Sequence, residues 1–259
     1  MADRPAVGTL AWVRETGGIL SRGERFSLLT KALVRQLAML PAQLRWRLGL
    51  VENRAPLEVS DIKAPDSALA KKAEEACRTQ APFIANHALR TYLWGRLFAA
   101  ADGVRFDDEL FYVASLCHDL GLKPAEGRVS HPAGCSCFTL ASAERAVGLA
   151  KGVGWNDGKC EHLGSAITLH MNPVVNRSEG AEAYLLAQGV GLDVVGARAW
   201  DLGRDQLKAV ATRHPREGFK KKFADTFEAE GKANPGSRTD FMMRYLMVGV
   251  LIRTTPFAE

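Results

Sequence analysis

Helical spacing of apolar residues along almost the whole chain is the feature that most limits its fold. After a capping box formed by Ser21 and Glu24, apolar side chains recur in steps of three and four residues, which is typical of one face of a helix. This helix is predicted to stop near Pro41, because proline lacks the backbone donor that a helix needs. No stretch alternates apolar and polar residues for long enough to form a sheet, so the sequence predicts an all-α helical bundle.

A polar, proline-bearing stretch at residues 52–65 separates this first helix from the remainder of the chain. We therefore expect residues 1–65 to form an N-terminal helical extension and linker, and residues 66–259 to form the bundle. The same apolar spacing and the helix-capping residues predict further helices in the bundle over residues 66–80, 82 to beyond 98, 107–119, 138–151, 157–170, 181–188, 204–213, 216–230 and 239–252.

Composition restricts the class of protein. With 47% apolar and 24% charged residues, the 259-residue chain is expected to be an ordinary globular protein and not a disordered or fibrous one. The 34 Lys and Arg residues exceed the 29 Asp and Glu residues to give a net charge of +5. This excess is compatible with anionic substrates or surfaces, but it is too small to indicate a nucleic-acid partner.

The sequence also carries expectations about location and partners. Its start lacks the pattern of a secretory signal, and its longest apolar stretch, residues 241–252, is interrupted by Arg244 and is too short to span a bilayer. Five cysteines, an odd number, lie mostly among apolar neighbours, as is typical of reduced thiols. We expect a cytoplasmic protein that acts on a small molecule, with a homo-oligomer as one arrangement that the sequence allows.

The adjacent pair His118 and Asp119 stands at the predicted end of a helix. Both side chains can turn towards one point where the helix unwinds, and an imidazole with a carboxylate is a ligand pair for a divalent metal ion. His87 lies on the inward apolar stripe of the preceding helix and is a candidate third ligand. A histidine hydrogen-bonded in the core is the alternative interpretation of His87.

Two later helices, at 138–151 and 157–170, have nearly equal predicted lengths. If they pair as an antiparallel hairpin, the end of the second lies beside the start of the first. This geometry predicts that His170 lies near Thr139 and near the loop that contains His131. These three residues are therefore candidate catalytic residues.

Five motifs in this order resemble the HD-domain superfamily, and they are most similar to its cyanamide-hydratase-like branch. The resemblance covers about residues 66–235, and the residues before it match no family. The motifs are NHALRTYLWG at 86–95, LCHDLG at 116–121, ITLH at 167–170, GLDVVG at 191–196 and HPREGFK at 214–220.

The resemblance implies a single divalent metal ion held by His87, His118, Asp119 and Asp193. Without the resemblance, Asp193 would be interpreted as a turn residue between helices. Zinc is the favoured metal, and iron and manganese are alternatives. The resemblance further implies that His170 lies close to the metal and holds a water molecule or the substrate.

The chain departs from the family pattern at two places. Thr139 and Ala141 stand where related sequences often have carboxylates, and Thr139 cannot replace a carboxylate as a base near neutral pH. His131 is a candidate substitute, with a surface-loop histidine as the alternative interpretation. Many phosphodiesterase members have Gly-Lys soon after the His-Asp pair, whereas here Gly121 and Lys123 are separated by a leucine.

The family resemblance implies a metal-dependent hydrolase or hydratase that activates water to attack a small nitrile- or amide-like substrate. The first alternative is a phosphohydrolase acting on a nucleotide or phosphate ester, with Arg90 or Lys123 binding the substrate and balancing its charge. A dinuclear iron oxygenase and a non-catalytic HD-domain binding protein are the remaining alternatives.

Overall fold

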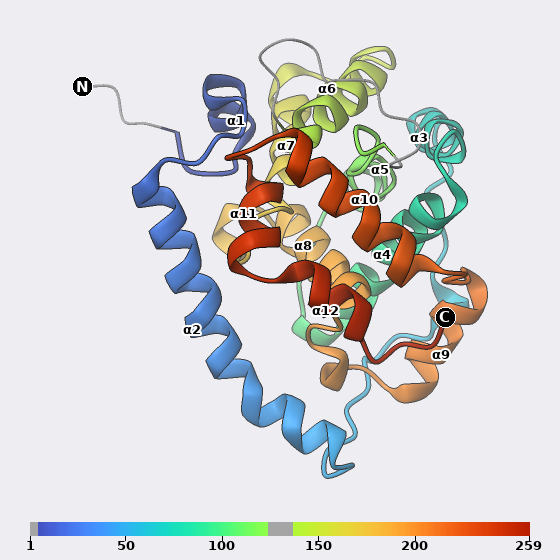
Figure 1. Ribbon diagram of the computed structural model, residues 1–259. Helices are drawn as coiled ribbons and strands as arrows, with labels where there is room; N and C mark the ends of the chain where they lie inside the picture. Colours follow the sequence, from blue (N-terminus) through green and yellow to red (C-terminus); the bar gives the residue numbers. More distant parts are fainter. Residues whose placement is uncertain (1–4, 124–136) are drawn as a thin grey trace.

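The computed structural model describes residues 5–123 and 137–259. This part of the chain contains twelve α-helices and no strand, which confirms the predicted all-α class (Figure 1). The helices are α1 (Leu10–Thr16), α2 (Arg22–Arg47), α3 (Ala68–Arg78), α4 (Pro82–Asp102), α5 (Asp108–Cys117), α6 (Phe138–Lys151), α7 (Asp157–Leu169), α8 (Ala181–Val195), α9 (Arg204–Arg213), α10 (Phe219–Ala233), α11 (Arg238–Tyr245) and α12 (Val248–Thr254). Short 3-10 turns lie at Val59–Asp61, Arg177–Glu179 and Ala199–Asp201.

Helices α4 and α8 form the centre of the bundle and pack against each other more extensively than any other pair in the described residues. Helix α4 is apolar around most of its circumference, as expected for a helix that is enclosed on all sides. Gly189 allows α8 to come close to α4, because a Cβ atom there would lie 2.5 Å from the carbonyl oxygen of Thr91. The two backbones are therefore held at a distance that a larger residue would not permit.

Helices α5 and α7 lie against this pair, and α6 packs along α7 as the predicted hairpin. Asp107 caps α5 by accepting a hydrogen bond from the backbone N–H of Leu110. After α5 ends at Cys117, the chain passes so close to the start of α6 that a Cβ atom on Gly121 would lie 2.2 Å from the carbonyl oxygen of Phe138. The chain can follow this path after His118 only because residue 121 has no side chain.

Two predicted helix boundaries in the second half of the chain are wrong. Helix α8 continues beyond residue 188 to Val195, so Asp193 lies within a helix and not in a turn. The helix predicted at 239–252 is divided into α11 and α12, because Met247 adopts a left-handed backbone conformation with φ of 51°. No Gly or Pro marks this break in the sequence.

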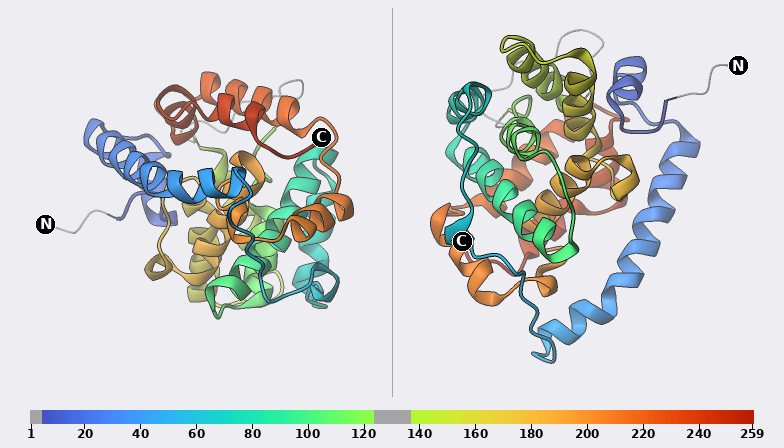
Figure 2. Two further views of the ribbon diagram at one scale, coloured as in Figure 1. Left: turned by 90° about the horizontal axis from the view of Figure 1, so that it is seen from below. Right: turned by 180° about the vertical axis from the view of Figure 1, so that it is seen from behind.

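Helix α2 also differs from its prediction. The capping box of Ser21 and Glu24 is present, but the helix passes through Pro41 and ends at Arg47. Pro41 leaves the carbonyl group of Leu37 without its helical donor, and water can satisfy that group because both residues are exposed. Helix α2 runs along the outside of the bundle, away from α4 and α5 (Figure 1; Figure 2).

Within the described residues, no helix has both the length and the apolar character that crossing a membrane requires.

Candidate metal centre

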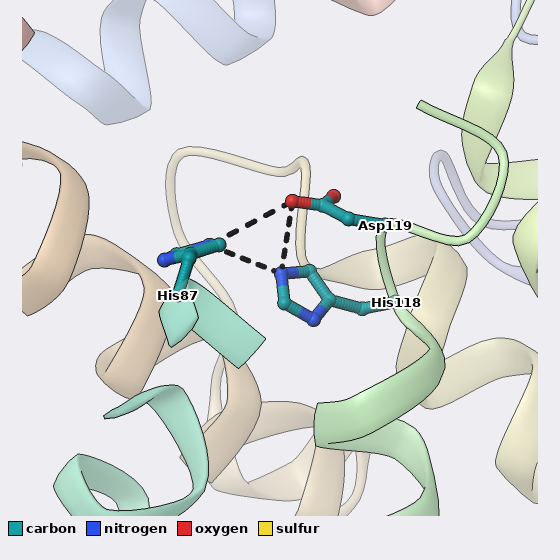
Figure 3. A group of neighbouring side chains, drawn as sticks. All are labelled: His87, His118 and Asp119. Atoms are coloured by element: carbon teal, nitrogen blue, oxygen red, sulfur yellow. Dashed lines mark hydrogen bonds and ion pairs between the residues drawn. The ribbon is translucent and has the colours of Figure 1, made fainter. Parts of the chain in front are cut away.

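Three ligand-type side chains converge in the interior of the bundle (Figure 3). His87 comes from the second turn of α4, while His118 and Asp119 follow the last residue of α5. Both histidine side chains are fully buried, and Asp119 is 2% exposed. The predicted convergence of His87, His118 and Asp119 is therefore present, and this buried group can hold a metal ion.

The separations between the three ligand atoms fit one small cation. Nε2 of His118 lies 3.2 Å from Nε2 of His87 and 3.3 Å from Oδ2 of Asp119, and the remaining side of the triangle is 3.7 Å. Ligand atoms about 2.0 to 2.2 Å from a tetrahedral ion lie about 3.3 to 3.6 Å from one another. The side chains therefore stand nearly at coordination distance from a common point.

Hydrogen bonds on the far side of each ring determine which nitrogen faces this point. Nδ1 of His118 lies 2.7 Å from the carbonyl oxygen of Ser115, and Nδ1 of His87 lies 2.8 Å from Oδ2 of Asp193. Because both partners are acceptors, each Nδ1 carries the hydrogen and each Nε2 presents a lone pair. Two lone pairs and a carboxylate oxygen thus face one another, an arrangement that a cation stabilises.

His170 lies beside this group, at the C-terminal end of α7. Its ring packs edge-on against His118 with centroids 4.9 Å apart, and its Nε2 lies 3.8 Å from Oδ1 of Asp119. Its Nδ1 donates to the carbonyl oxygen of Ile167 at 2.5 Å, so this third Nε2 also lacks a hydrogen. The predicted placement of His170 near the metal ligands agrees with this geometry.

Electrostatics in the group favour a positive charge. Burial acts to raise the pKa of Asp119, but attraction to His118, His87 and His170 outweighs it and lowers the pKa to about 2. Burial acts to lower the pKa of His118, but the charge of Asp119 outweighs it and raises the pKa. Oδ2 of Asp119 has no hydrogen-bond partner among the described residues. The buried carboxylate of Asp119 thus attracts a proton or a metal ion to the point that faces both Nε2 atoms.

Asp193 does not occupy the predicted ligand position. Its carboxylate faces Nδ1 of His87, on the opposite side of the ring from Nε2, and it does not belong to the group that can hold a metal. Oδ1 and Oδ2 accept two hydrogen bonds from Arg90 at 2.8 Å, and Oδ1 also accepts from Trp94 and Arg216 at 3.0 Å. These donors use the oxygen lone pairs, so Asp193 holds the orientation of His87 and does not itself face the group that can hold a metal.

Arg90 is likewise placed differently from its prediction as a substrate-binding residue. The side chain is fully buried. Its guanidinium group donates to Asp193 and to the carbonyl oxygens of His214 and Pro215. Together, Arg90 and Arg216 keep the pKa of Asp193 well below its usual range, although burial acts to raise it. Arg90 therefore stabilises the ligand support and does not offer a free donor to a substrate.

The other predicted site residues divide into three cases. The hydroxyl of Thr139 is buried and accepts a hydrogen bond at 2.9 Å from Nη2 of Arg238. Lys123 is exposed and makes no ion pair with any other residue that the structure describes. His131 lies outside the described residues.

Two arginines near the site were not identified from the sequence. Arg216 lies in the HPREGFK segment, where the family resemblance is a signal that could have indicated it. Arg238 is fully buried and has no carboxylate partner among residues 5–123 and 137–259. Nothing in the sequence around Arg238 distinguishes it from a surface residue.

A scan against protein-family models and a search of curated proteins find no match to this chain.

Proposed function

We propose that this chain is a metal-dependent HD-domain enzyme, a hydrolase or hydratase that acts on a small nitrile- or amide-like substrate. The observation that carries the proposal is the orientation of three buried imidazoles, each with Nδ1 bonded to an acceptor and Nε2 directed towards Asp119 or its neighbours. The order of the HD-like motifs along the sequence supports the same assignment.

His87, His118 and Asp119 would hold the ion, with zinc as the favoured metal. When bound, a divalent ion in such a site lowers the pKa of a water molecule towards neutrality and polarises the substrate. The ion has three protein ligands in this assignment, which leaves positions for water and substrate, as in catalytic zinc sites.

The surrounding residues have distinct roles. Asp193 fixes the tautomer and the plane of His87, while Arg90 and Arg216 keep Asp193 ionised. Burial, followed by repulsion from His118, lowers the pKa of His170 to about 3. The Nε2 atom of His170 therefore stays unprotonated at neutral pH and can accept a hydrogen bond from a polar substrate or a water molecule.

The burial and the apolar surroundings of the site favour a small substrate. The rings of Phe219 and Phe223 lie 5.3 and 5.2 Å from the ring of His87 and form an apolar wall. Together with the burial of His118 and Asp119, this wall excludes bulk water, which strengthens electrostatic interactions inside the site.

One observation favours the phosphate-ester alternative. Arg238 is a buried cation without a carboxylate partner in the described part of the chain, and it contacts Thr168 and Thr139 next to His170. A negatively charged substrate could balance this charge. Arg238 would then have the role that the sequence assigned to Arg90 or Lys123.

The experiment that tests the proposal combines metal analysis with a substrate panel. We expect the purified protein, incubated with zinc, iron or manganese, to retain about one equivalent of metal per chain. The loaded protein should convert nitriles, amides or aryl phosphates, and the reacting class distinguishes the two functions. An Asp119→Asn variant should lose both metal and turnover.

A Glu75→Gln variant is the matched control, because it removes one exposed carboxylate from α3. This variant should retain both properties. Wild-type metal content in the Asp119→Asn protein would contradict the proposal, whereas two iron ions per chain would favour the dinuclear oxygenase. A loaded protein that turns over nothing in the panel would favour a binding role.

A further inference from the structure

Helix α2 carries a large exposed apolar surface. The described chain has fourteen exposed large apolar residues, and nine of them lie in or directly after this helix. Monomeric proteins seldom expose a continuous patch of this kind unless it binds a protein or a membrane. The nine residues, called the α2 stripe below, are Phe26, Leu29, Leu33, Val34, Leu37, Leu40, Leu44, Leu48 and Leu50.

The centre of the α2 stripe faces directly away from the bundle. At about 100° per residue, Phe26, Leu33, Leu37, Leu40 and Leu44 fall within an arc of about 60° on the helix. The only buried residues of the helix, Leu28 and Trp46, lie on the opposite side. The apolar face of this amphipathic helix is therefore turned to solvent. The opposite side, which carries Leu28 and Trp46, contacts the rest of the protein.

The helix is loosely seated on the bundle. Of its 26 residues, the two that are buried stand near its two ends. A cavity of about 260 Å³ lies beside helix residues 23–31, and a second of about 420 Å³ lies beside helix residues 35–42; both separate part of the helix from residues 172–201. A partner on the outer face would supply packing that the bundle does not provide.

The charge of the chain is concentrated on the same helix. Residues 22–47 contain six basic residues and one acidic residue, which equals the net charge of +5 of the whole chain. The other 233 residues contain 28 basic and 28 acidic residues and are neutral overall. The partner of α2 should therefore carry negative charge.

Basic residues also stand at both ends of the α2 stripe. Arg22 and Arg47 project on the same side as the leucines, since they differ from Leu33 by about 20° and 40° around the helix. Arg45 is exposed along its flank. Apolar side chains bordered by arginines that can reach the headgroups are typical of a helix that lies in the plane of a membrane interface.

We propose that α2 binds the surface of a bilayer that contains anionic phospholipids, with the α2 stripe inserted among the acyl chains. A second copy of this chain fits less well. An antiparallel pair of α2 helices would place Arg22 against Arg47 at both ends, and a parallel pair would place each arginine against its own copy. Neither pairing offers an acidic residue on the stripe side to offset the repulsion.

Vesicle sedimentation with the full chain tests this assignment. We expect the protein to bind vesicles of phosphatidylcholine with about 30% phosphatidylserine, and to bind pure phosphatidylcholine vesicles at least about tenfold more weakly. Raising the salt concentration from about 0.1 M to about 0.5 M should weaken the binding. A wild-type protein that stays in the supernatant with the anionic vesicles would overturn the proposal.

Two pairs of variants separate the apolar and the charged contributions. Replacing Leu33 and Leu37, each 57% exposed, with Gln should weaken binding to the anionic vesicles at least about tenfold, because less apolar surface is inserted. Glutamine preserves helix propensity and neither residue contacts the core. The matched control replaces Val250 and Leu251 on α12, which are also exposed, and should leave the binding unchanged.

The charge pair replaces Arg45 and Arg47 with Gln and should also weaken binding about tenfold or more. Its control replaces two exposed lysines on other helices, Lys72 and Lys208, which lowers the net charge equally. Binding that both α2 variants retain would overturn the proposal. A second outcome would also overturn it: the protein forms a dimer by light scattering, the Leu33→Gln and Leu37→Gln changes dissociate that dimer, and the protein does not bind anionic vesicles.

Discussion

An Asp193→Asn variant keeps the shape of the side chain and removes its charge. In the wild type, the carboxylate accepts hydrogen bonds from His87, Arg90, Trp94 and Arg216, all of which reach it in the fully buried interior. The amide group of Asn would direct its own hydrogens at two of these donors, and it would leave two arginines without a buried counter-charge.

The size of the effect follows from this network. Removing one partner of a buried ion pair typically costs about 3 to 5 kcal/mol, because the remaining charge is left uncompensated. Asp193 is fully buried, so solvent does not reduce this value. For a chain of this size each kcal/mol lowers the melting temperature by roughly 2 to 4 °C. We therefore expect a loss of about 10 °C in the metal-free protein.

The same change should also weaken metal binding. Without an acceptor at Nδ1, His87 is no longer held in the tautomer that presents Nε2, and loss of such an outer partner typically reduces metal affinity about 10- to 100-fold. Urea unfolding of the metal-free protein and a competitive zinc titration measure the two effects separately. Asp119→Asn is the informative comparison, because it should abolish metal binding with a much smaller loss of stability.

If Asp193→Asn unfolds within about 1 kcal/mol of the wild type, the buried network does not stabilise the fold as argued. If instead Asp193→Asn loses all metal while its metal-free stability is unchanged, Asp193 is a direct ligand and its assignment as a support for His87 is wrong.

Gly121→Ala should destabilise the protein by about 1 to 3 kcal/mol in urea unfolding, because the added Cβ would meet the carbonyl of Phe138. Pro41→Ala should increase amide-exchange protection in the second half of α2, because a donor to the carbonyl of Leu37 is restored. Burial, then repulsion from Arg213, lowers the pKa of His214 to about 4. In the unfolded chain the pKa of this histidine is near 6.5, so below that pH the unfolded chain binds the proton more readily than the folded protein does. The free energy of unfolding should therefore fall as the pH is lowered from 6.5 to 4. A His214→Gln variant should show a flatter dependence of this free energy on pH when it is measured by urea unfolding.

Local signals explain which elements could be predicted from the sequence. Ser21 caps its helix in the structure as expected, and Ser67 and Asp107 cap helices in the same way, because a capping side chain and the backbone it bonds are only three residues apart. His87 and His118 could be paired because both are polar residues among inward apolar positions of helices joined by a short loop.

The features that the sequence does not reveal depend on information that is not local. The apolar period of α2 indicates an amphipathic helix, but the period does not say whether the apolar face is covered by the same chain. Asp193 was interpreted as a ligand because a family resemblance supplies residue identities and not the side of the His87 ring that a carboxylate approaches. That side depends on how α8 crosses α4, which becomes visible only when both helices are packed.

The close crossing of α4 and α8 at Gly189 also has a kinetic consequence. Because α4 and α8 pack this closely, we expect their amide hydrogens to exchange only when the whole protein opens. His87 and Asp193, which lie on these two helices, should then not separate by local fluctuation. His118 and Asp119, in contrast, stand where the backbone leaves α5. An ion would therefore enter and leave through movements of these two residues, with His87 as the fixed point, and the rate of metal exchange should be set by the end of one helix and not by global unfolding.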